Sequence, residues 1–184
     1  MTEHNEIPYE GLAARFRVVE AYSGGEGWSG LVVPRDAGED PTPRVLKILD
    51  AGIRPQEASV LASLEHPSIP RILDVGHADE HWFLLREHVA GTPLQQTFPL
   101  DVDDAKRLAV SLLTTLAFVH MRGILHLDLK PSNVIRRDDG EYALLDFGLA
   151  SRSGDRASGG SLMFAAPERL VGAAADESSD LYSV

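Results

Sequence analysis

The sequence contains no cysteine, which excludes a disulfide framework and any metal site built from thiolates. Its seven histidines include no pair at metal-ligand spacing, so no structural zinc is expected. A long apolar run is also missing: the longest, from Leu108 to Val119, is interrupted by polar residues and is shorter than the roughly 20 residues that span a bilayer. The amino terminus lacks a basic segment followed by an apolar one, so we expect a cytoplasmic chain with no membrane partner in this segment.

Positive charge is scarce as well: 17 Lys and Arg stand against 28 Asp and Glu, which gives a formal net charge of -11. Nonspecific nucleic-acid binding depends on clustered Lys and Arg, so no nucleic-acid partner is expected, and the acidic surface is better explained as an aid to solubility. What the chain does have is 43% apolar and 24% charged residues over 184 positions, the composition of one globular unit with a real core.

Five short runs of apolar, mostly β-forming residues occupy the first half of the chain. They cover residues 16–19, 31–33, 45–49, 72–75 and 82–85, separated by Gly, Pro and Asp. Such runs predict a twisted antiparallel sheet, and the polar segment 34–44 predicts an exposed hairpin connection within it. One helix is predicted between the third and fourth runs, with Pro55 in its first turn and Glu57, Leu61 and Leu64 on one face.

A second helix is predicted in the middle of the chain. Asp101 or Asp103 offers its N-cap, and Gly123 lies near its end. Its apolar face consists of Leu108, Leu112, Leu116 and Val119.

Three motifs follow this helix. The first is the stretch His126-Leu-Asp128-Leu-Lys130-Pro-Ser-Asn133, the second is Asp146-Phe147-Gly148 after a strand-like segment at 143–145, and the third is Ala166-Pro167-Glu168. At about one chance in twenty per position, the four polar residues of the first motif arise in about one window in 10^5, and each triplet in about one in 10^4. Coincidence is therefore no serious explanation.

These motifs resemble the catalytic loop, the metal-binding loop and the activation-segment end of eukaryotic-type (Hanks-type) serine/threonine protein kinases, including bacterial ones. The resemblance implies an α+β, protein-kinase-like bilobal fold. Its N-lobe, residues 1–90, would be an antiparallel sheet with one helix, and residues 91–184 would form an incomplete, mainly helical C-lobe. It also implies ATP and Mg²⁺ as cofactors and an unidentified protein as substrate.

The resemblance gives each polar residue of the motifs one role. Asp128 would orient the substrate hydroxyl and accept its proton, while Lys130 would neutralise the migrating phosphoryl group. Asn133 and Asp146 would hold magnesium, a hard ion that prefers oxygen ligands. An Asp near a Lys is more often a plain surface ion pair, and that is the alternative for Asp128 and Lys130 taken alone.

His126 has the side chain whose pKa lies nearest neutrality, which would suit a general base. The resemblance favours another role: a packing and hydrogen-bonding hub against Phe147.

Glycines between the first two predicted strands would let the backbone approach phosphates without a Cβ clash, although a plain hairpin turn explains such a pattern taken alone. Lys47 resembles the strand lysine that contacts the α and β phosphates and pairs with a helix glutamate. Segment 87–89 resembles the hinge whose backbone hydrogen-bonds adenine. The residues that the resemblance assigns to the nucleotide are Gly25, Gly27, Gly30, Val32, Val45, Lys47, Glu57, Glu87 and Val89.

Three residues depart from the family pattern. Val45 replaces the usual alanine, and its bulkier side chain would crowd adenine. Arg86 precedes the hinge where an apolar or hydroxyl residue is usual, and we hypothesise that it tunes or blocks the nucleotide site; a rotation that points it outward is the alternative. Leu127 replaces an arginine that grips a phosphorylated activation segment, so little dependence on phosphorylation is expected. The serines of that segment are Ser151, Ser153, Ser158 and Ser161.

Segment 179–184 resembles the start of the helix that anchors a large lobe, after which the family has further helices. We expect a longer chain or a partner to supply that part, and we expect Leu112 and Leu116 to face the missing partner. Two functions remain open. One is an ATP- and Mg²⁺-dependent serine/threonine kinase domain, and the other is a catalytically silent, kinase-like interaction module, which Arg86, Val45 and Leu127 favour.

Overall fold

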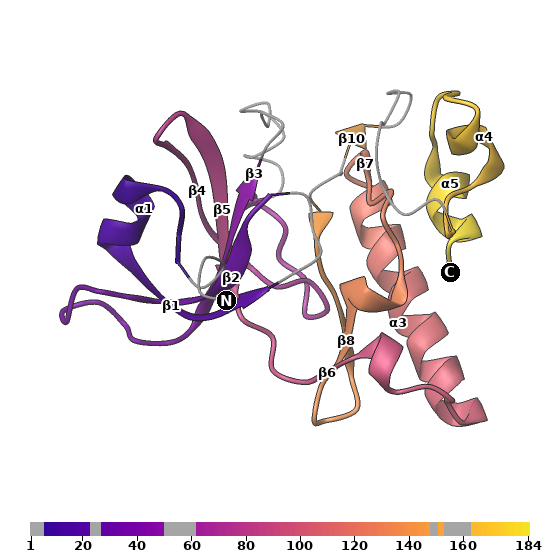
Figure 1. Ribbon diagram of the computed structural model, residues 1–184. Coiled ribbons are helices and arrows are strands. Elements are labelled where there is room, and N and C mark those ends of the chain that lie inside the picture. Colours follow the sequence, from indigo (N-terminus) through magenta and orange to yellow (C-terminus); the bar gives the residue numbers. More distant parts are fainter. Residues whose placement is uncertain (1–5, 23–26, 50–61, 148–150, 153–162) are drawn as a thin grey trace. The chain divides into compact units, whose positions relative to one another are not determined.

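The computed structural model describes residues 6–22, 27–49, 62–147, 151–152 and 163–184. The chain divides into two compact units: Met1–Ser63 with Arg71–His88 form unit 1, and Leu64–Pro70 with Val89–Val184 form unit 2 (Figure 1). Several predicted features lie outside the described residues, namely the helix near Pro55, Gly25, Glu57, Ser153, Ser158 and Ser161.

Unit 1 is built on a five-stranded antiparallel sheet. Its strands are β1 (Phe16–Tyr22), β2 (Ser29–Pro34), β3 (Arg44–Leu49), β4 (Ile72–Ala78) and β5 (His81–Glu87), in the order β1-β2-β3-β5-β4. Each strand contains one of the five predicted runs, so the predicted sheet is confirmed. The connection between β2 and β3 is exposed over residues 35–43, as expected for a hairpin loop.

A short helix that the sequence did not predict, α1 (Glu10–Arg15), precedes the sheet and lies beside it (Figure 1). Six residues are too few to form a stable helix alone, so α1 depends on tertiary contacts. Its Leu12 is fully buried. The core that it joins consists of Ile7, Leu12, Phe16, Val32, Leu46, Ile48, Phe83 and Leu85.

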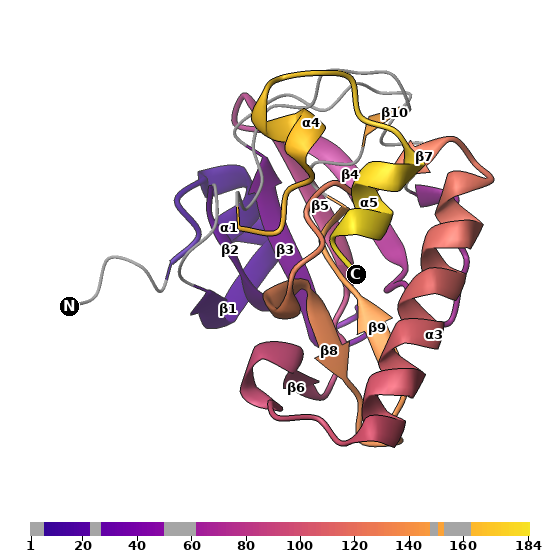
Figure 2. The ribbon, with the colours of Figure 1, turned by 90° about the vertical axis from the view of Figure 1, so that its right-hand side faces the viewer.

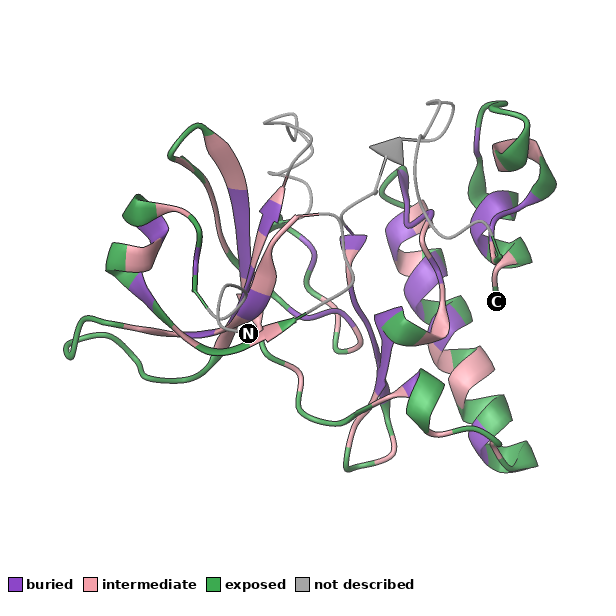
Figure 3. Ribbon diagram, in the orientation of Figure 1, coloured by how far each residue is buried: buried purple, intermediate pink, exposed green. Residues whose placement is uncertain are grey.

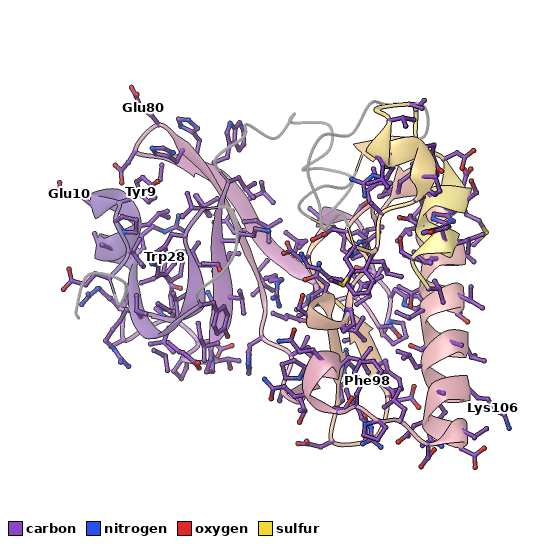
Figure 4. All side chains as sticks on the ribbon, turned by 45° about the vertical axis from the view of Figure 1, so that its right-hand side comes forward. Tyr9, Glu10, Trp28, Glu80, Phe98 and Lys106 are labelled. Carbon is purple, nitrogen blue, oxygen red and sulfur yellow. The ribbon has the colours of Figure 1, made fainter. Side chains whose placement is uncertain are left out.

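The turn between β4 and β5 caps the start of α1. Asp79 and Glu80 form this turn with φ values of 49° and 64°, the left-handed conformation typical of tight hairpins. The carboxylate of Asp79 accepts a hydrogen bond of 2.7 Å from the backbone N–H of Gly11 in the first turn of the helix. The Tyr9 ring, at the start of α1 (Figure 4), lies 4.4 Å from the ring of His81. The hairpin therefore holds the start of α1 through two contacts, at Gly11 and at Tyr9.

We predict that Asp79→Ala lowers the free energy of unfolding by about 1–2 kcal/mol, because it removes the cap and places an alanine at positive φ. Urea denaturation followed by circular dichroism measures the change. Asp79→Asn is the matched control, since asparagine tolerates this φ and keeps an oxygen acceptor; it should stay near the wild-type value. Equal losses in the two variants would contradict the capping role.

Unit 2 combines helices with two small sheets (Figure 2). Its helices are η1 (Leu94–Gln96), α3 (Val102–His120), η2 (Pro131–Asn133), α4 (Pro167–Leu170) and α5 (Glu177–Tyr182). Its strands are β6 (Thr92–Pro93), β7 (Ile124–Leu125), β8 (Val134–Arg136), β9 (Tyr142–Leu144) and β10 (Ser151–Arg152), paired as β6-β8-β9 and β10-β7.

The helix α3 confirms the second predicted helix. The side chain of Asp101 accepts from the backbone N–H of Asp104, so Asp101 is the N-cap. The expectation that Leu112 and Leu116 lack a partner is wrong: both are buried, because α3 packs against β7, β9 and α5 (Figures 2 and 3). The outer face of α3 is polar or exposed, and Lys106 points away from it (Figure 4). Within the described part of the chain, no helix has the length and apolar character needed to cross a membrane.

Candidate active site

The β8–β9 hairpin of unit 2 brings two predicted site residues together. Val134 pairs with Leu144, so the residue before β8, Asn133, and the residues after β9 lie at the same end of the hairpin. A hydrogen bond of 2.7 Å from the backbone N–H of Leu145 to the carbonyl of Asn133 extends the pairing by one step. Asp146 follows directly, with a φ of 64°. The fold thus places Asn133 beside the chain segment that carries Asp146.

The loop between β7 and β8 carries the other predicted catalytic residues. One carboxylate oxygen of Asp128, Oδ2, lies 2.7 Å from Nζ of Lys130 and 3.0 Å from Nδ2 of Asn133. The same Nδ2 donates to the backbone carbonyl of Asp128 at 2.8 Å. The Asp128 side chain is only 10% exposed and that of Lys130 25%. This burial and the shared amide donor distinguish the arrangement from a solvated surface ion pair.

His126 is fully buried and makes two hydrogen bonds that fix its tautomer. Its Nδ1 accepts from the backbone N–H of Asp128 at 3.2 Å, and its Nε2 lies 2.8 Å from the carbonyl oxygen of Leu145, which can only accept. The ring therefore carries its single proton on Nε2 and is neutral. Burial lowers the pKa of His126. Its ring also meets Phe147 edge-on, with centroids 4.7 Å apart, so the predicted role as a hub is confirmed.

Two oxygen donors of this site suit magnesium. Because Nδ2 of Asn133 is committed to Asp128, the amide oxygen of Asn133 is the atom that would coordinate a metal, together with the carboxylate of Asp146. Magnesium usually takes one or two carboxylates and completes its shell with water and phosphate oxygens. Among the described residues no cluster of three or more His, Cys, Asp or Glu side chains could hold a metal ion. The donor set therefore fits an ion that is shared with a phosphate ligand.

The sheet of unit 1 brings a second group of predicted residues onto one face. Directly opposite residues in antiparallel strands share a face, and so do residues two apart on one strand. Val45 on β3 lies opposite Leu31 on β2 and opposite Arg86 on β5. Lys47 follows two residues after Val45 and lies opposite Leu84. This face, which we call the lysine face, presents a cation beside an apolar strip.

The structure corrects the prediction for Val32. Val32 is fully buried in the apolar core and lies opposite Arg44, so it belongs to the other face of the sheet. Leu31, which the sequence analysis missed, lies on the lysine face instead. Leu31 and Val32 are neighbours on one strand, and a shift of one residue in strand register exchanges the two faces. No pattern within the sequence of β2 distinguishes Leu31 from Val32, because only the pairing of β2 with β3 decides which of them shares a face with Lys47.

Two of the predicted glycines are required by the backbone itself. Gly27 has a φ of 75°, which favours glycine. A Cβ on Gly30 would lie 2.8 Å from the carbonyl oxygen of Glu20 and 2.9 Å from the ring of Trp28. Both positions therefore have a structural reason to be glycine that is independent of any bound phosphate.

At the end of β5, the carboxylate, the N–H and the carbonyl of Glu87 all take part in hydrogen bonds. Its carboxylate pairs with Arg71 Nε at 3.2 Å and accepts the backbone N–H of Arg71 at the same distance. Its own N–H donates to the carbonyl of Arg71 at 2.9 Å. Its carbonyl accepts from Nη1 of Arg86 at 3.1 Å. Val89, the last residue of the predicted hinge, is the first of the second stretch of unit 2.

Arg86 therefore lies on the lysine face and bonds to the carbonyl of the next residue. Burial first, and then the charge of Arg86, lowers the pKa of the neighbouring His88. A guanidinium at this point acts both as a charge and as a donor to the backbone of segment 87–89.

Comparisons with known proteins agree with this geometry. Residues 45–184 match the family model described as the protein kinase domain. The chain is 37% identical over 143 residues to serine/threonine-protein kinase D of Synechocystis sp. and 39% identical over 143 residues to serine/threonine-protein kinase pkn2 of Myxococcus xanthus. It is 33% identical over 139 residues to the probable serine/threonine-protein kinase PknB of Lactococcus lactis.

Each of these matches covers 70% of the chain. They cover a much smaller share of the relatives, which is 28% of the Synechocystis protein, 17% of the Myxococcus protein and 22% of the Lactococcus protein.

Proposed function

Because the chain belongs to the protein kinase domain family, we propose that it transfers the γ-phosphoryl group of ATP to a serine or threonine hydroxyl of a protein. Family membership also establishes the fold class predicted from the sequence, an incomplete protein-kinase-like fold with an antiparallel N-lobe sheet. In this proposal residues 1–90 serve as the N-lobe and residues 91–184 as part of the C-lobe.

The single observation that carries the proposal is the arrangement around Asp128. Transition states of phosphoryl transfer spread negative charge over the transferring group, so catalysis depends on positioning and charge neutralisation. The Asp128 carboxylate is held in place by Lys130 and Asn133 within 3.0 Å and is nearly buried. It would orient the substrate hydroxyl and accept its proton, while the Lys130 ammonium would neutralise charge on the phosphoryl oxygens.

The two oxygen donors at the end of the β8–β9 hairpin would complete the phosphate end of the site. Asn133 and Asp146 would hold Mg²⁺, which supplies charge neutralisation to the phosphates of ATP. Neutral His126 would not take part in proton transfer, since both of its nitrogens are committed to the backbone. His126 would instead hold the backbone at Asp128 and at Leu145, after β9, in fixed positions relative to each other.

The lysine face of unit 1 would bind the nucleotide. Lys47 would contact phosphate oxygens, and Leu31 and Val45 would offer the apolar surface on which adenine rests. Val45 is only 4% exposed, whereas Leu31 is only partly buried, so Leu31 would supply most of that surface. This assigns the adenine contact to Leu31 rather than to Val32.

Product analysis tests the proposal. The chain is incubated with Mg²⁺, ATP labelled at the γ-phosphate and a generic basic protein, and the labelled amino acid is identified after hydrolysis. We expect phosphoserine or phosphothreonine, because a lysine two residues after the catalytic aspartate resembles serine/threonine kinases. Label on tyrosine alone would contradict the substrate class, and no label on any protein would contradict the proposed reaction.

One observation favours a second candidate, a kinase-like module that does not turn over ATP. The guanidinium of Arg86 donates to the carbonyl of Glu87, and the resemblance makes this segment the one that hydrogen-bonds adenine. A carbonyl that already accepts from a cation is a weaker partner for the amino group of adenine. In this alternative, Arg86 keeps nucleotide affinity low.

The ATP affinity of the Arg86→Met variant tests whether Arg86 restrains the nucleotide site. If Arg86 restrains the site, removal of its donor should raise the affinity for ATP by about tenfold, since a hydrogen bond to a charged group contributes on the order of 1.5–3 kcal/mol. Isothermal titration with Mg²⁺ and ATP measures the affinity. Arg35→Met is a suitable control, because Arg35 also donates to backbone carbonyls of unit 1, at 2.8 Å and 3.1 Å, but in the loop after β2. An unchanged affinity in Arg86→Met would rule out the restraint.

A further inference from the structure

The residue before Asp128 has an unusual backbone. Leu127 has a φ of 62°, in the left-handed region that a leucine rarely adopts. Such a conformation is strained for a residue with a side chain and persists only where its surroundings hold it. Because Leu127 is adjacent to Asp128, whatever holds this conformation also sets the direction in which the Asp128 side chain leaves the backbone.

The N–H, the side chain and the carbonyl of Leu127 each contact the carboxyl-terminal segment of unit 2. Its N–H donates to Oδ1 of Asp180 at 2.7 Å. Its side chain is 3% exposed and packs with Leu125 and Ala175. Its carbonyl oxygen accepts a hydrogen bond from Nη1 of Arg169.

The carbonyl contact bears most directly on Asp128, because the carbonyl of Leu127 and the N–H of Asp128 belong to one planar peptide group. Arg169 holds the oxygen of this group, and Nδ1 of His126 accepts its N–H at 3.2 Å. Contacts at both ends restrict rotation of this peptide plane, and this limits the directions in which the Asp128 side chain can leave the backbone.

Arg169 belongs to α4, which is anchored by contacts at Glu168 within the helix and at Phe164 before it. The hydroxyl of Ser179 donates to the carboxylate of the preceding residue, Glu168, whose carbonyl accepts the N–H of Ala173 at 2.9 Å. The hydroxyl of Ser183 donates to the carbonyl of Phe164 at 2.6 Å. The guanidinium is therefore presented from a segment that is tied to α5, the helix that also carries Asp180.

We propose that Arg169 is a positioning residue for phosphoryl transfer: it holds the Leu127 carbonyl and thereby the orientation of Asp128. This rests on the proposed function. Arg169 also connects segment 163–170 to the catalytic loop without a phosphate group. The Leu127 side chain is apolar and buried, so it could not bind a phosphate on that segment. Phosphorylation of the segment is then not required for an ordered Asp128.

Three variants test the role. Arg169→Ala removes the donor, Arg169→Lys keeps a cation that can reach the carbonyl, and Arg122→Ala is a matched control. Arg122 also donates to a backbone carbonyl in unit 2, that of Phe118 at 2.9 Å, but at the exposed end of α3. We measure kcat and KM for ATP, and hydrogen–deuterium exchange of the backbone amides of residues 126–133.

We expect Arg169→Ala to lower kcat by about tenfold or more with an unchanged KM for ATP, the loss produced when one charge-assisted hydrogen bond disappears. The amides of Leu127 and Asp128 should exchange faster while the strands of unit 1 keep their protection. Arg169→Lys should restore most of both quantities, and Arg122→Ala should change neither.

Other results would overturn the proposal. One is an Arg169→Ala variant whose kcat and amide exchange equal those of the wild type. Another is uniformly faster exchange throughout unit 2 in this variant, which would indicate a merely structural role. If the wild-type chain transfers no phosphate, the proposed function fails, and the exchange comparison between Arg169→Ala and Arg122→Ala still decides whether Arg169 orders the loop.

Discussion

Asp128→Asn should lower the rate of phosphoryl transfer by about 10²–10⁴, the range expected when a general base is removed. Asparagine has nearly the same shape and can still contact Lys130 and Asn133, so the loop should remain folded. What it lacks is the basic oxygen that would take the proton of the substrate hydroxyl. The measurement is the initial rate of label transfer from γ-labelled ATP, with circular dichroism to show that the fold is retained.

The control for this prediction is Asp103→Asn. Asp103 also faces a lysine, Lys106 at 3.5 Å, but its side chain is 79% exposed on α3 and far in sequence from the catalytic loop. Loss of a surface pair of this kind changes little. A rate in Asp128→Asn within a few-fold of that in Asp103→Asn would show that Asp128 is not the base.

Asp180→Ala should destabilise the chain by about 3–5 kcal/mol, because it leaves buried donors without their acceptor. The Asp180 side chain is completely buried. Its carboxylate accepts the backbone N–H groups of His126 and Leu127 at 2.8 Å and 2.7 Å, and it contacts Nε2 of His120 at 2.8 Å. For a chain of this size the loss corresponds to a fall of roughly 10 °C in the thermal midpoint.

Differential scanning calorimetry measures this fall, and Asp103→Ala on the exposed face of α3 is the comparison, with an expected change near zero. If Asp180→Ala unfolded at the wild-type temperature, the carboxylate could not be what holds the left-handed turn before Asp128. Phosphoryl transfer should be lost with the structure, because both N–H groups belong to the catalytic loop.

Stability should also depend on pH through Asp180. Burial alone would raise the pKa of this carboxyl, but the hydrogen bonds from His120 and from the N–H groups of His126 and Leu127 outweigh burial and hold the pKa below its ordinary value. A carboxyl with a depressed pKa contributes stability above its unfolded-state pKa and loses it as the pH falls through the folded-state pKa. The thermal midpoint should therefore fall on acidification, and less so in Asp180→Ala.

Features that depend on local sequence could be predicted from the sequence. Short runs of apolar, mostly β-forming residues identified the five strands of the unit 1 sheet, and an acidic residue before an apolar helical pattern identified the start of α3. The catalytic loop could be found because its residues lie within eight positions of one another. The packing of His126 against Phe147 could be inferred from the family, although the neutral tautomer required the hydrogen bonds.

Features that depend on strand register and tertiary contacts could not be predicted from the sequence. The helix α1 has no signal of its own, because its cap comes from Asp79, far along the chain. Leu31 and Val32 are both apolar, and only the pairing of β2 with β3 decides which of them shares a face with Lys47. The role of Arg169 depends on a positive φ at Leu127, and no sequence pattern indicates that a leucine adopts it.

The most direct test of the account is phosphoryl transfer by three matched chains: the wild type, Asp146→Ala and Asp139→Ala. Both aspartates belong to the β8–β9 region, but Asp146 lies beside Asn133, whereas Asp139 is in the turn at the other end of the hairpin, where it accepts the N–H of Glu141 at 3.0 Å. Transfer of label from ATP to the chain itself and to a basic protein should occur in the wild type and in Asp139→Ala, and should vanish in Asp146→Ala. Equal transfer by all three chains, or none by the wild type, would contradict the assignment of this site to phosphoryl transfer.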